Sequence, residues 1–257
     1  MGDVTFTYDW YRGFLRTLQD RGYRSRRYTE PPSSGDLYLR HDVDFSPRKA
    51  LRIASIESEA GLQSTYLFLV TSPAYNLGFK PTREIVAEIQ AMGHDVGLHF
   101  STHQYWDADP GRRELRERAA AEFDILSGVV ERPSRVLSFH RPPEWVFGRS
   151  YDGFVSTYEP RFFSEVCYLS DSNMRWRDEP PLAQGGTPDA LQVLTHPGLW
   201  GERDASFEDR LRSEIDRELG RIRQFMLDQF VEKKYNVDEY CYTPPRRTTS
   251  GKPLDVD

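Results

Sequence analysis

Two aspartates one residue apart, Asp42 and Asp44, stand in the segment LRHDVDFSPRKAL (39–51), directly after a short apolar run. Side chains alternate along a strand, so both carboxylates are expected on the same side of it. Two neighbouring carboxylates repel each other unless positive charge lies between them. The pair therefore indicates a source of positive charge close by.

Two histidines four residues apart, His99 and His103, lie in GLHFSTHQY (97–105), at and just beyond the end of another apolar run. A chain with six histidines produces such pairs by chance, so the spacing alone is weak evidence. Two imidazoles and one carboxylate nevertheless make an open three-ligand site for a divalent metal, which leaves positions for water and substrate. The alternative is structural, with histidines that only form hydrogen bonds at strand ends.

Other unusual polar residues also follow apolar runs. They are His140 and Arg141 in FHRPPEW, Asp171 and Trp176 in SDSNMRW, and His196 in LTHPGLW. The carboxyl ends of parallel strands form the edge at which α/β folds build active sites. We therefore expect these side chains to converge on one site.

The apolar runs predict six strands, at 37–41, 65–70, 95–100, 135–140, 166–170 and 191–195. Helical segments are expected between them at 48–61, 82–93 and 111–128, with Thr82 capping the second and Gly93 ending it. Alternating strands and helices indicate parallel βαβ units in a barrel or a doubly wound sheet. The near-continuous apolar strands indicate a sheet covered on both faces.

Helices are also predicted on either side of this block. Apolar residues at helical spacing predict one from Phe6 to Leu18, ended by Gly22. A long amphipathic helix is predicted at about 206–231, with Ser206 and Asp209 as a capping pair. Its apolar stripe is expected to pack into the core, and consists of Phe207, Leu211, Ile215, Leu219, Ile222 and Met226. Residues 1–233 are interpreted as one domain, and 234–257 as a polar tail.

The bulk composition excludes several classes of function. With 34 Lys and Arg against 40 Asp and Glu, the net charge of −6 argues against a nucleic-acid partner. No apolar run reaches the ~18 residues of a membrane span, so no stable membrane insertion is expected. The segment MGDVTFTYDWYRGFL lacks the features of a signal peptide. Cys167 and Cys241 are too few for a disulfide framework, so a cytoplasmic location is expected. The oligomeric state stays open.

The motifs resemble, in the same order, those of the polysaccharide deacetylases, the NodB-homology group of carbohydrate esterase family four. RHDVD (40–44) corresponds to the first motif, GHDVGLHFSTH (93–103) to the second and RPP (141–143) to the third. Asp171 with Trp176 corresponds to the fourth, and VLTH (193–196) to the fifth. The resemblance covers about residues 36–200 and implies an α/β fold, a distorted (β/α) barrel of the NodB-like deacetylase type.

The resemblance also implies a role for each matching residue. Asp44, His99 and His103 would be ligands of a divalent metal ion, with zinc expected, and Asp42 would be the catalytic base. Arg141 would act in catalysis by helping the metal to neutralise the two carboxylates.

On the other side of the implied site, His196 would protonate the departing amine, with Asp171 orienting its ring. Trp176 would form a wall of the site and contact the substrate. The remaining histidines are expected only to pack or form hydrogen bonds near the site. These are His41, His94 and His140.

The implied activity is metal-dependent hydrolysis of an N-acyl group, expected to be acetyl, from a sugar or sugar conjugate used in surface glycan synthesis. Phe100 stands where the family has Ser or Thr, and Glu144 where Tyr is common, which argues against the usual polymer-binding groove. A small N-acylated sugar, nucleotide- or lipid-linked, is therefore expected. Two alternatives remain: hydrolysis of a non-sugar amide or ureide, and a catalytically inactive carbohydrate-binding relative.

Overall fold

The computed structural model describes residues 3–182 and 187–232. The chain divides into two compact units, Met1–Asp216 and Arg217–Asp257, with the boundary inside helix α6 (Phe207–Leu227). In the described part of the second unit, the end of α6 is followed by a π-helical stretch, Asp228–Glu232. The domain end predicted at 233 and the predicted tail, 234–257, lie outside the described residues.

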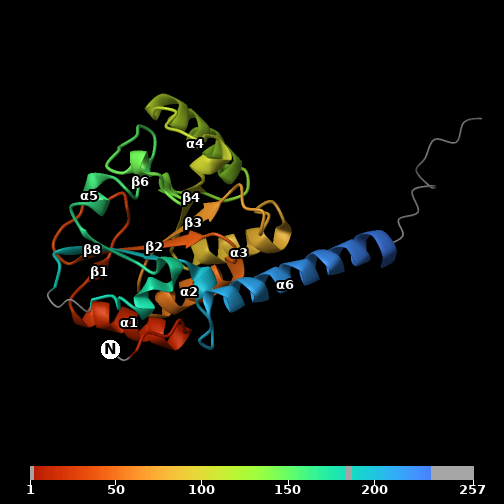
Figure 1. The fold of residues 1–257 in the computed structure, drawn as a ribbon, viewed down its shortest axis with the longest axis horizontal. Helices are drawn as coiled ribbons and strands as arrows, with labels where there is room; N and C mark the ends of the chain where they lie inside the picture. The colour runs from red at the N-terminus through yellow and green to blue at the C-terminus, as the bar shows by residue number, and fades with distance from the viewer. Residues whose placement is uncertain (1–2, 183–186, 233–257) are drawn as a thin grey trace, which may run out of the picture. The chain divides into compact units, whose positions relative to one another are not determined.

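A parallel sheet forms the centre of the first unit (Figure 1). Its strands run in the order β6-β5-β4-β3-β2-β8-β7, and β1 pairs with β2 off this path. The seven strands of the path curl into a half-barrel, so the predicted α/β class and distorted barrel are confirmed. The strands are β1 (Arg24–Ser25), β2 (Asp36–Val43), β3 (Thr65–Leu69), β4 (Asp95–Phe100), β5 (Val136–Phe139), β6 (Val155–Ser156), β7 (Cys167–Ser170) and β8 (Ala190–Thr195).

All six predicted strands are present, as β2, β3, β4, β5, β7 and β8. Every residue of β2 is buried, because this strand lies between β3 and β8 and both its faces are covered. The two further strands, β1 and β6, have two residues each. A segment of that length carries no alternation or apolar run, so sequence patterns could not predict it.

Helices follow most of the strands. They are α2 (Pro47–Glu59), α3 (Lys80–Ala91), α4 (Arg112–Ser127) and the short α5 (Pro160–Phe163), whereas α1 (Tyr8–Asp20) precedes the first strand. Helix α2 packs against α1 and α3, as Figure 1 shows. Single 3₁₀ turns follow several strand ends, at η1 (Thr102–Gln104), η2 (Glu144–Val146), η3 (Ser172–Arg177) and η4 (Pro197–Leu199).

Helix α3 begins two residues before the predicted cap. Phe79 is its N-cap, and Thr82 lies inside the helix with 7% of its surface exposed, so the prediction of Thr82 as a cap is wrong. Pro81 accounts for the difference, because proline fits the first turn of a helix, where its missing N–H is not needed. Gly93 ends the helix as predicted, with a φ of 92° that suits glycine.

The stripe of α6 is not a core element. Phe207, Leu211 and Ile215, in the first unit, are 44%, 36% and 49% exposed. The buried side chain of this stretch is Glu214, which accepts a hydrogen bond from Ser46 Oγ (3.0 Å) and pairs with Lys49 Nζ (3.2 Å). Polar contacts of Glu214 therefore hold the start of α6, while the three apolar side chains stay partly exposed.

The rest of the stripe is also exposed in the second unit, at Leu219 (60%), Ile222 (49%) and Met226 (49%). The expectation of core packing is wrong for this helix, since apolar periodicity identifies an amphipathic helix but not what covers it. The predicted capping pair is confirmed, because Asp209 N donates to Ser206 Oγ (3.1 Å). Within the described ranges, no helix combines the length and the hydropathy that a membrane span requires.

Candidate metal and catalytic site

Five strand ends bring polar side chains to one edge of the sheet. Asp42 lies near the end of β2 and Asp44 just beyond it, while His99 is the penultimate residue of β4. Because all these strands are parallel, their carboxyl ends meet at the same edge. The other residues at this edge directly follow β5, β7 and β8, and they are His140, Asp171 and His196.

All of these residues except Asp171, which lies buried behind His196, line a cavity of 480 Å³ in the first unit. Asp42 and Asp44 both line it, as the alternation of side chains along β2 predicts. His99 and His196 line the same cavity, so the two predicted halves of the site share one rim. Aromatic side chains form much of the remaining wall, including Phe147, Tyr158, Phe163 and Tyr168.

Three of the lining residues form a cluster of metal-ligand atoms. Asp44, His99 and His140 each offer one donor atom within 4.8 Å of the others. Asp44 Oδ1 lies 2.9 Å from His140 Nδ1 and 3.2 Å from His99 Nε2, and the two ring nitrogens are 3.2 Å apart. One carboxylate and two imidazoles are a donor set for a divalent ion.

Hydrogen bonds behind His99 fix which ring nitrogen can bind an ion. Ser138 Oγ donates to Asp42 Oδ1 (2.9 Å), so its oxygen accepts from His99 Nδ1 (2.6 Å). One proton of this imidazole then resides on Nδ1, so Nε2 is the nitrogen that faces Asp44 and is available to an ion. His99 Nε2 and Asp44 Oδ1 lie 3.2 Å apart, a contact that either a second proton on the ring or a metal ion can bridge, so these residues fit a metal ion.

Electrostatics in the cluster favour the ionised carboxylate of Asp44. Burial opposes its ionisation, but hydrogen bonds from His140 and His99, together with the positive charge of His99 and His196, outweigh burial and hold its pKa well below the usual value. Asp44 is therefore a carboxylate, which is the state that binds metal.

His103 lies outside this cluster. Its Nε2 donates to the backbone carbonyl of Arg141 (2.9 Å), and its side chain is exposed. The i,i+4 spacing places two histidines on one face only within a helix, whereas His99 is in a strand and His103 follows in the turn η1. His140, which was expected only to pack near the site, is the third member of the donor cluster.

Asp42 is neutralised by Arg40, not by Arg141. Arg40 Nε lies 2.9 Å from Asp42 Oδ1, and Nη2 lies 2.7 Å from Oδ2, a bidentate pair in which both side chains are almost completely buried. Arg40 Nη2 also donates to Tyr158 Oη (2.9 Å). The expected role of Arg141 in neutralising this carboxylate is therefore corrected, since its own side chain is exposed. Alternation along β2 was an available signal, because residues 40, 42 and 44 share a face.

The pairing with Arg40 keeps Asp42 ionised. Burial alone would raise the pKa of this carboxyl group, but the charges of Arg40 and His99 and the hydrogen bonds from Arg40 lower it to about 2. Asp42 is consequently a carboxylate at neutral pH, and it is a weaker base than an unpaired aspartate would be.

His196 and Asp171 form the predicted pair. His196 Nδ1 lies 2.6 Å from Asp171 Oδ1, and its backbone N–H donates to both carboxylate oxygens (3.0 Å). Burial opposes protonation of the ring, but the charge of Asp171 and its hydrogen bond raise the pKa of His196 to about 9, with Asp44 and Asp42 contributing. His196 therefore carries a proton at neutral pH in this arrangement.

Trp176 does not line the cavity. It is 2% exposed and packs against Phe14 (5.3 Å between ring centroids) and Trp10 (6.1 Å), which is inconsistent with the predicted contact to substrate. Asn173 and Met174, with φ of 55° and 57°, turn the chain so that this ring points into the core. The tryptophan that touches the His–Asp pair is Trp200, whose Nε1 donates to Asp171 Oδ2 (2.9 Å); sequence spacing gave no sign of it.

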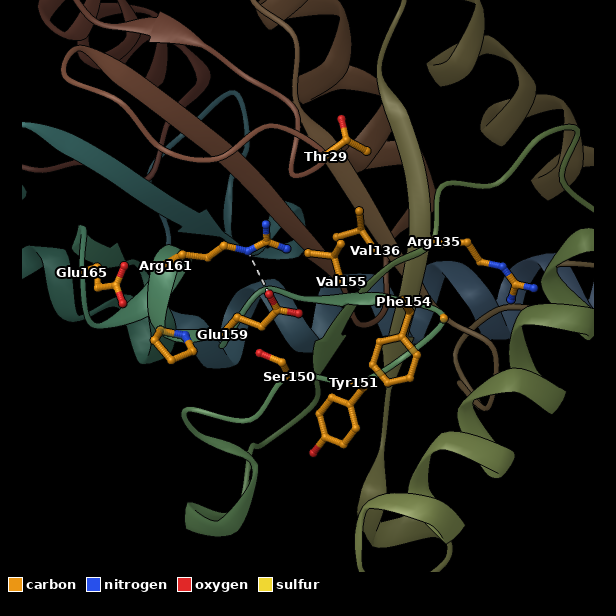
Figure 2. A pocket seen from close by; sticks show the side chains of 12 residues that line it. Thr29, Arg135, Val136, Ser150, Tyr151, Phe154, Val155, Glu159, Arg161 and Glu165 are labelled. Atoms are coloured by element: carbon orange, nitrogen blue, oxygen red, sulfur yellow. Dashed lines mark hydrogen bonds and ion pairs between the residues drawn. The ribbon is translucent and has the colours of Figure 1, made fainter.

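A second cavity, of 690 Å³, lies beside the amino ends of β5 and β6 (Figure 2). None of its described lining residues is a histidine, and its wall includes Glu159 and Arg161. Figure 2 shows these two side chains directed at each other, with Arg161 Nε 2.9 Å from Glu159 Oε2. Glu159 and Arg161 therefore neutralise each other. The cluster of Asp44, His99 and His140 lies at the smaller cavity.

No protein-family model and no curated protein matches the chain. Among solved structures, it is similar to a family 4 acetyl xylan esterase from Clostridium thermocellum in complex with a cobalt ion, at 13% identity over 73% of this chain and 83% of that one, with a TM-score of 0.41. It is similar to a chitin deacetylase from the fungal pathogen Colletotrichum lindemuthianum, at 14% identity over 74% and 84%, with a TM-score of 0.42.

A third similar structure is a CE4 family pseudoenzyme from Bacillus anthracis, at 15% identity over 75% of this chain and 63% of that one, with a TM-score of 0.42. The similar structures thus include both esterases or deacetylases and a pseudoenzyme. At this identity and TM-score, similarity alone does not assign an activity to this chain.

Proposed function

We propose that this protein is a metal-dependent hydrolase that removes an N-acyl group, acetyl in the simplest case, from a sugar or sugar conjugate. The observation that carries the proposal is the meeting of a metal-donor set with an ionised aspartate and a protonated histidine at one cavity. Metal-assisted hydrolysis of an amide uses these three functions as Lewis acid, general base and general acid. The order of motifs along the chain supports a deacetylase of the NodB-homology type.

Asp44, His99 and His140 would hold the ion. A divalent metal, when bound, supplies a Lewis acid that polarises the acyl carbonyl and lowers the pKa of water. Zinc is the proposed ion, since two imidazoles and a carboxylate are among its usual ligands. Ser138 supports the ligand His99, because its hydroxyl oxygen accepts a hydrogen bond from His99 Nδ1 and so keeps the proton on that nitrogen.

Asp42 and His196 would carry the protons. Asp42 accepts a proton from the attacking water, whose oxygen forms a bond to the acyl carbon. The C–N bond then breaks, and protonated His196 delivers its proton to the departing nitrogen. Asp171 orients the His196 ring through the 2.6 Å contact, and the products are a carboxylate and a free amine.

The cavity supports a small substrate. A volume of 480 Å³ is in the usual range for sites that bind small molecules, and its aromatic walls suit the apolar faces of a sugar ring. A soluble N-acylated sugar is therefore proposed over a polymer, with a role in building a surface glycan. We also propose that the reaction takes place in the cytoplasm, in keeping with the free Cys167.

The test uses purified protein stripped with EDTA and reloaded with zinc or cobalt. Metal content is measured by mass spectrometry, and acetate release is measured on a panel of N-acetyl sugars, chitin oligomers and the ureide allantoin. Metal-dependent acetate release from sugars is expected. Ring opening of allantoin to allantoate, without acetate release from any sugar, would favour a non-sugar C–N hydrolase, and tight sugar binding without turnover of any compound would favour an inactive relative.

The Asp42→Asn variant tests the proton path. It should retain metal and lose turnover by about 10²–10⁴-fold, the usual contribution of a general base. Asp44→Asn should instead lose metal. If Asp42→Asn lost the metal while Asp44→Asn kept it, the two roles would be reversed.

A further inference from the structure

Two arginines at the cavity have no carboxylate partner among the described residues. Arg141 follows β5 and Arg175 lies in the turn η3, and both line the 480 Å³ cavity with exposed side chains. The two carboxylates that line the cavity already have other partners, because Arg40 pairs with Asp42 and the imidazoles contact Asp44. The two arginines therefore bring positive charge to the cavity that no described carboxylate neutralises.

The backbones that present these arginines are held in unusual conformations. Arg141 has a φ of 47°, a region that non-glycine residues rarely occupy, and His103 Nε2 donates to its carbonyl oxygen. Such strain persists only where surrounding contacts enforce it. The hydrogen bond gives His103 a structural task outside the metal cluster: it holds the loop that carries Arg141.

The second arginine is presented in a similar way. Asn173 and Met174, directly before Arg175, have φ of 55° and 57°, and Met174 N donates to the carbonyl of Asp171 (2.8 Å). The carbonyl of Arg175 accepts hydrogen bonds from the backbone N–H groups of Asp178 (3.1 Å) and Glu179 (2.9 Å). Both backbones are thus fixed, while both guanidinium groups stay available.

We propose that Arg141 and Arg175 bind an anionic substituent of the substrate, a phosphate or a carboxylate, and so make the enzyme selective for acidic N-acyl sugars. The proposal rests on the proposed function, since it concerns the substrate of the same cavity. Guanidinium groups bind planar or tetrahedral oxyanions through paired hydrogen bonds, which neutral sugars cannot match. The aromatic wall would then contact the sugar ring while the two arginines select its charged group.

The test measures binding to metal-free protein, so that a bound ion cannot capture the anion. Calorimetry compares N-acetylglucosamine, N-acetylglucosamine 1-phosphate and N-acetylmuramic acid, which carry no anionic group, a phosphate and a carboxylate. The acidic sugars should bind at least about tenfold more tightly than the neutral one, and high salt should reduce the difference. The better of the two acidic probes identifies the anion.

Substitutions of the two arginines test whether they cause the preference for acidic sugars. Arg175→Gln should weaken binding of the preferred acidic sugar about tenfold, and the double variant Arg141→Gln/Arg175→Gln should abolish the preference. Arg16→Gln is the matched control, because Arg16 is an exposed arginine on α1 and does not line the cavity. Equal binding of neutral and acidic sugars by the unaltered protein, or equal losses in Arg16→Gln and Arg175→Gln, would overturn the proposal.

The outcomes distinguish the anion-binding proposal from the proposed hydrolase activity. A preference for acidic sugars that depends on both arginines, without acetate release from any metal-loaded sample, would uphold anion binding and defeat the hydrolase. Acetate release at equal rates from neutral and acidic sugars, unchanged in Arg175→Gln, would uphold the hydrolase and defeat anion selection.

Discussion

Strand β2 separates two clusters of carboxylates and histidines. His41 and Asp42 are consecutive, so their side chains point to opposite faces of the sheet. On the face of His41 lies a closed cluster around Glu57 of α2, which is 0% exposed. Its carboxylate has four hydrogen-bond partners, namely Tyr11 Oη (2.5 Å), Ser64 Oγ (2.5 Å), Tyr66 Oη (2.7 Å) and His41 Nε2 (2.8 Å).

On the other face lies the open cluster of Asp44, His99 and His140. Here Asp44 Oδ1 lies 3.2 Å from His99 Nε2 and 2.9 Å from His140 Nδ1, and the side chains of Asp44 and His140 are 23% and 29% exposed. Both clusters combine histidine with a carboxylate, but among the described side chains only the two imidazoles contact the carboxylate of Asp44, with no hydroxyl donor. The comparison teaches that the supply of donors, and not the presence of histidine beside carboxylate, distinguishes a site for an ion from a structural network.

The largest expected effect is loss of the ion from the open cluster. His140→Ala should lose bound zinc and lower turnover by about 10³-fold, because a Lewis acid contributes several kcal/mol to the transition state. His103→Ala is the matched control and should keep its metal, since the hydrogen bond of its ring is to the carbonyl of Arg141 and not to the metal cluster. Metal analysis and acetate release measure both. Loss of metal in His103→Ala with retention in His140→Ala would restore the ligand set implied by the sequence.

The closed cluster should respond in stability and not in metal content. Glu57→Gln replaces one acceptor oxygen by a donor among four donors, and should lower the free energy of unfolding by about 3 kcal/mol. Urea unfolding measures the loss, and zinc binding at low temperature should be unchanged. Glu59→Gln, an exposed residue of the same helix, should change stability by less than about 0.5 kcal/mol. Loss of zinc from folded Glu57→Gln would show that the two clusters are coupled.

Acid should weaken the closed cluster in a defined pH window. Burial would raise the pKa of Glu57, but the charge of His41 and its hydrogen bond, with His94 and Ser64, lower it from 4.5 to about 2. Between these values the unfolded chain binds the proton and the folded chain does not. The contribution of Glu57, about 3 kcal/mol, is therefore present above pH 4.5 and is lost as the pH falls toward 2.

The measurement is urea unfolding of the unaltered protein and Glu57→Gln across pH 3 to 7. Their difference in stability should shrink as the pH falls, and the comparison cancels the contributions of Asp42 and Asp44. A difference that stays constant across this range would show that the carboxylate of Glu57 is not the group that titrates.

The smallest effect concerns the support of the open cluster. Ser138→Ala removes the acceptor for His99 Nδ1 and should weaken zinc binding by about 10–100-fold, with the ligands intact. Competition with a chromogenic chelator measures the affinity. Ser134→Ala, just before β5, is the control, since Ser134 Oγ contacts only the carbonyl of Val96 among the described residues. An unchanged affinity in Ser138→Ala would mean that another group fixes the His99 ring.

The fold was predictable where strands are apolar and flanked by helical segments. The positions of Asp44, His99 and His196 at one edge followed from this pattern, because the ends of parallel strands coincide. Arg40 could have been identified as the partner of Asp42 from the same alternation that aligned the two aspartates.

What sequence could not provide is the path of the chain just beyond each strand. The turn η1 carries His103 away from His99, while His140 follows β5 without a turn and stays at the cavity. Positive φ values at Asn173 and Met174 direct Trp176 into the core. These conformations depend on tertiary contacts, and no local pattern of residue types specifies them.

The central place of β2 has a consequence for how the protein is made. β2 pairs with β8, so that Asp36 lies opposite Ala190, although most of the sheet is encoded between them. A nascent chain exposes this edge of β2 until β8 has left the ribosome, and parallel pairing over such a separation is slow. Asp42 and His196 consequently meet only near the end of folding. Synthesis paused before residue 190 should leave a chain that depends on chaperones, with the metal donors Asp44, His99 and His140 already made and the proton donor still absent.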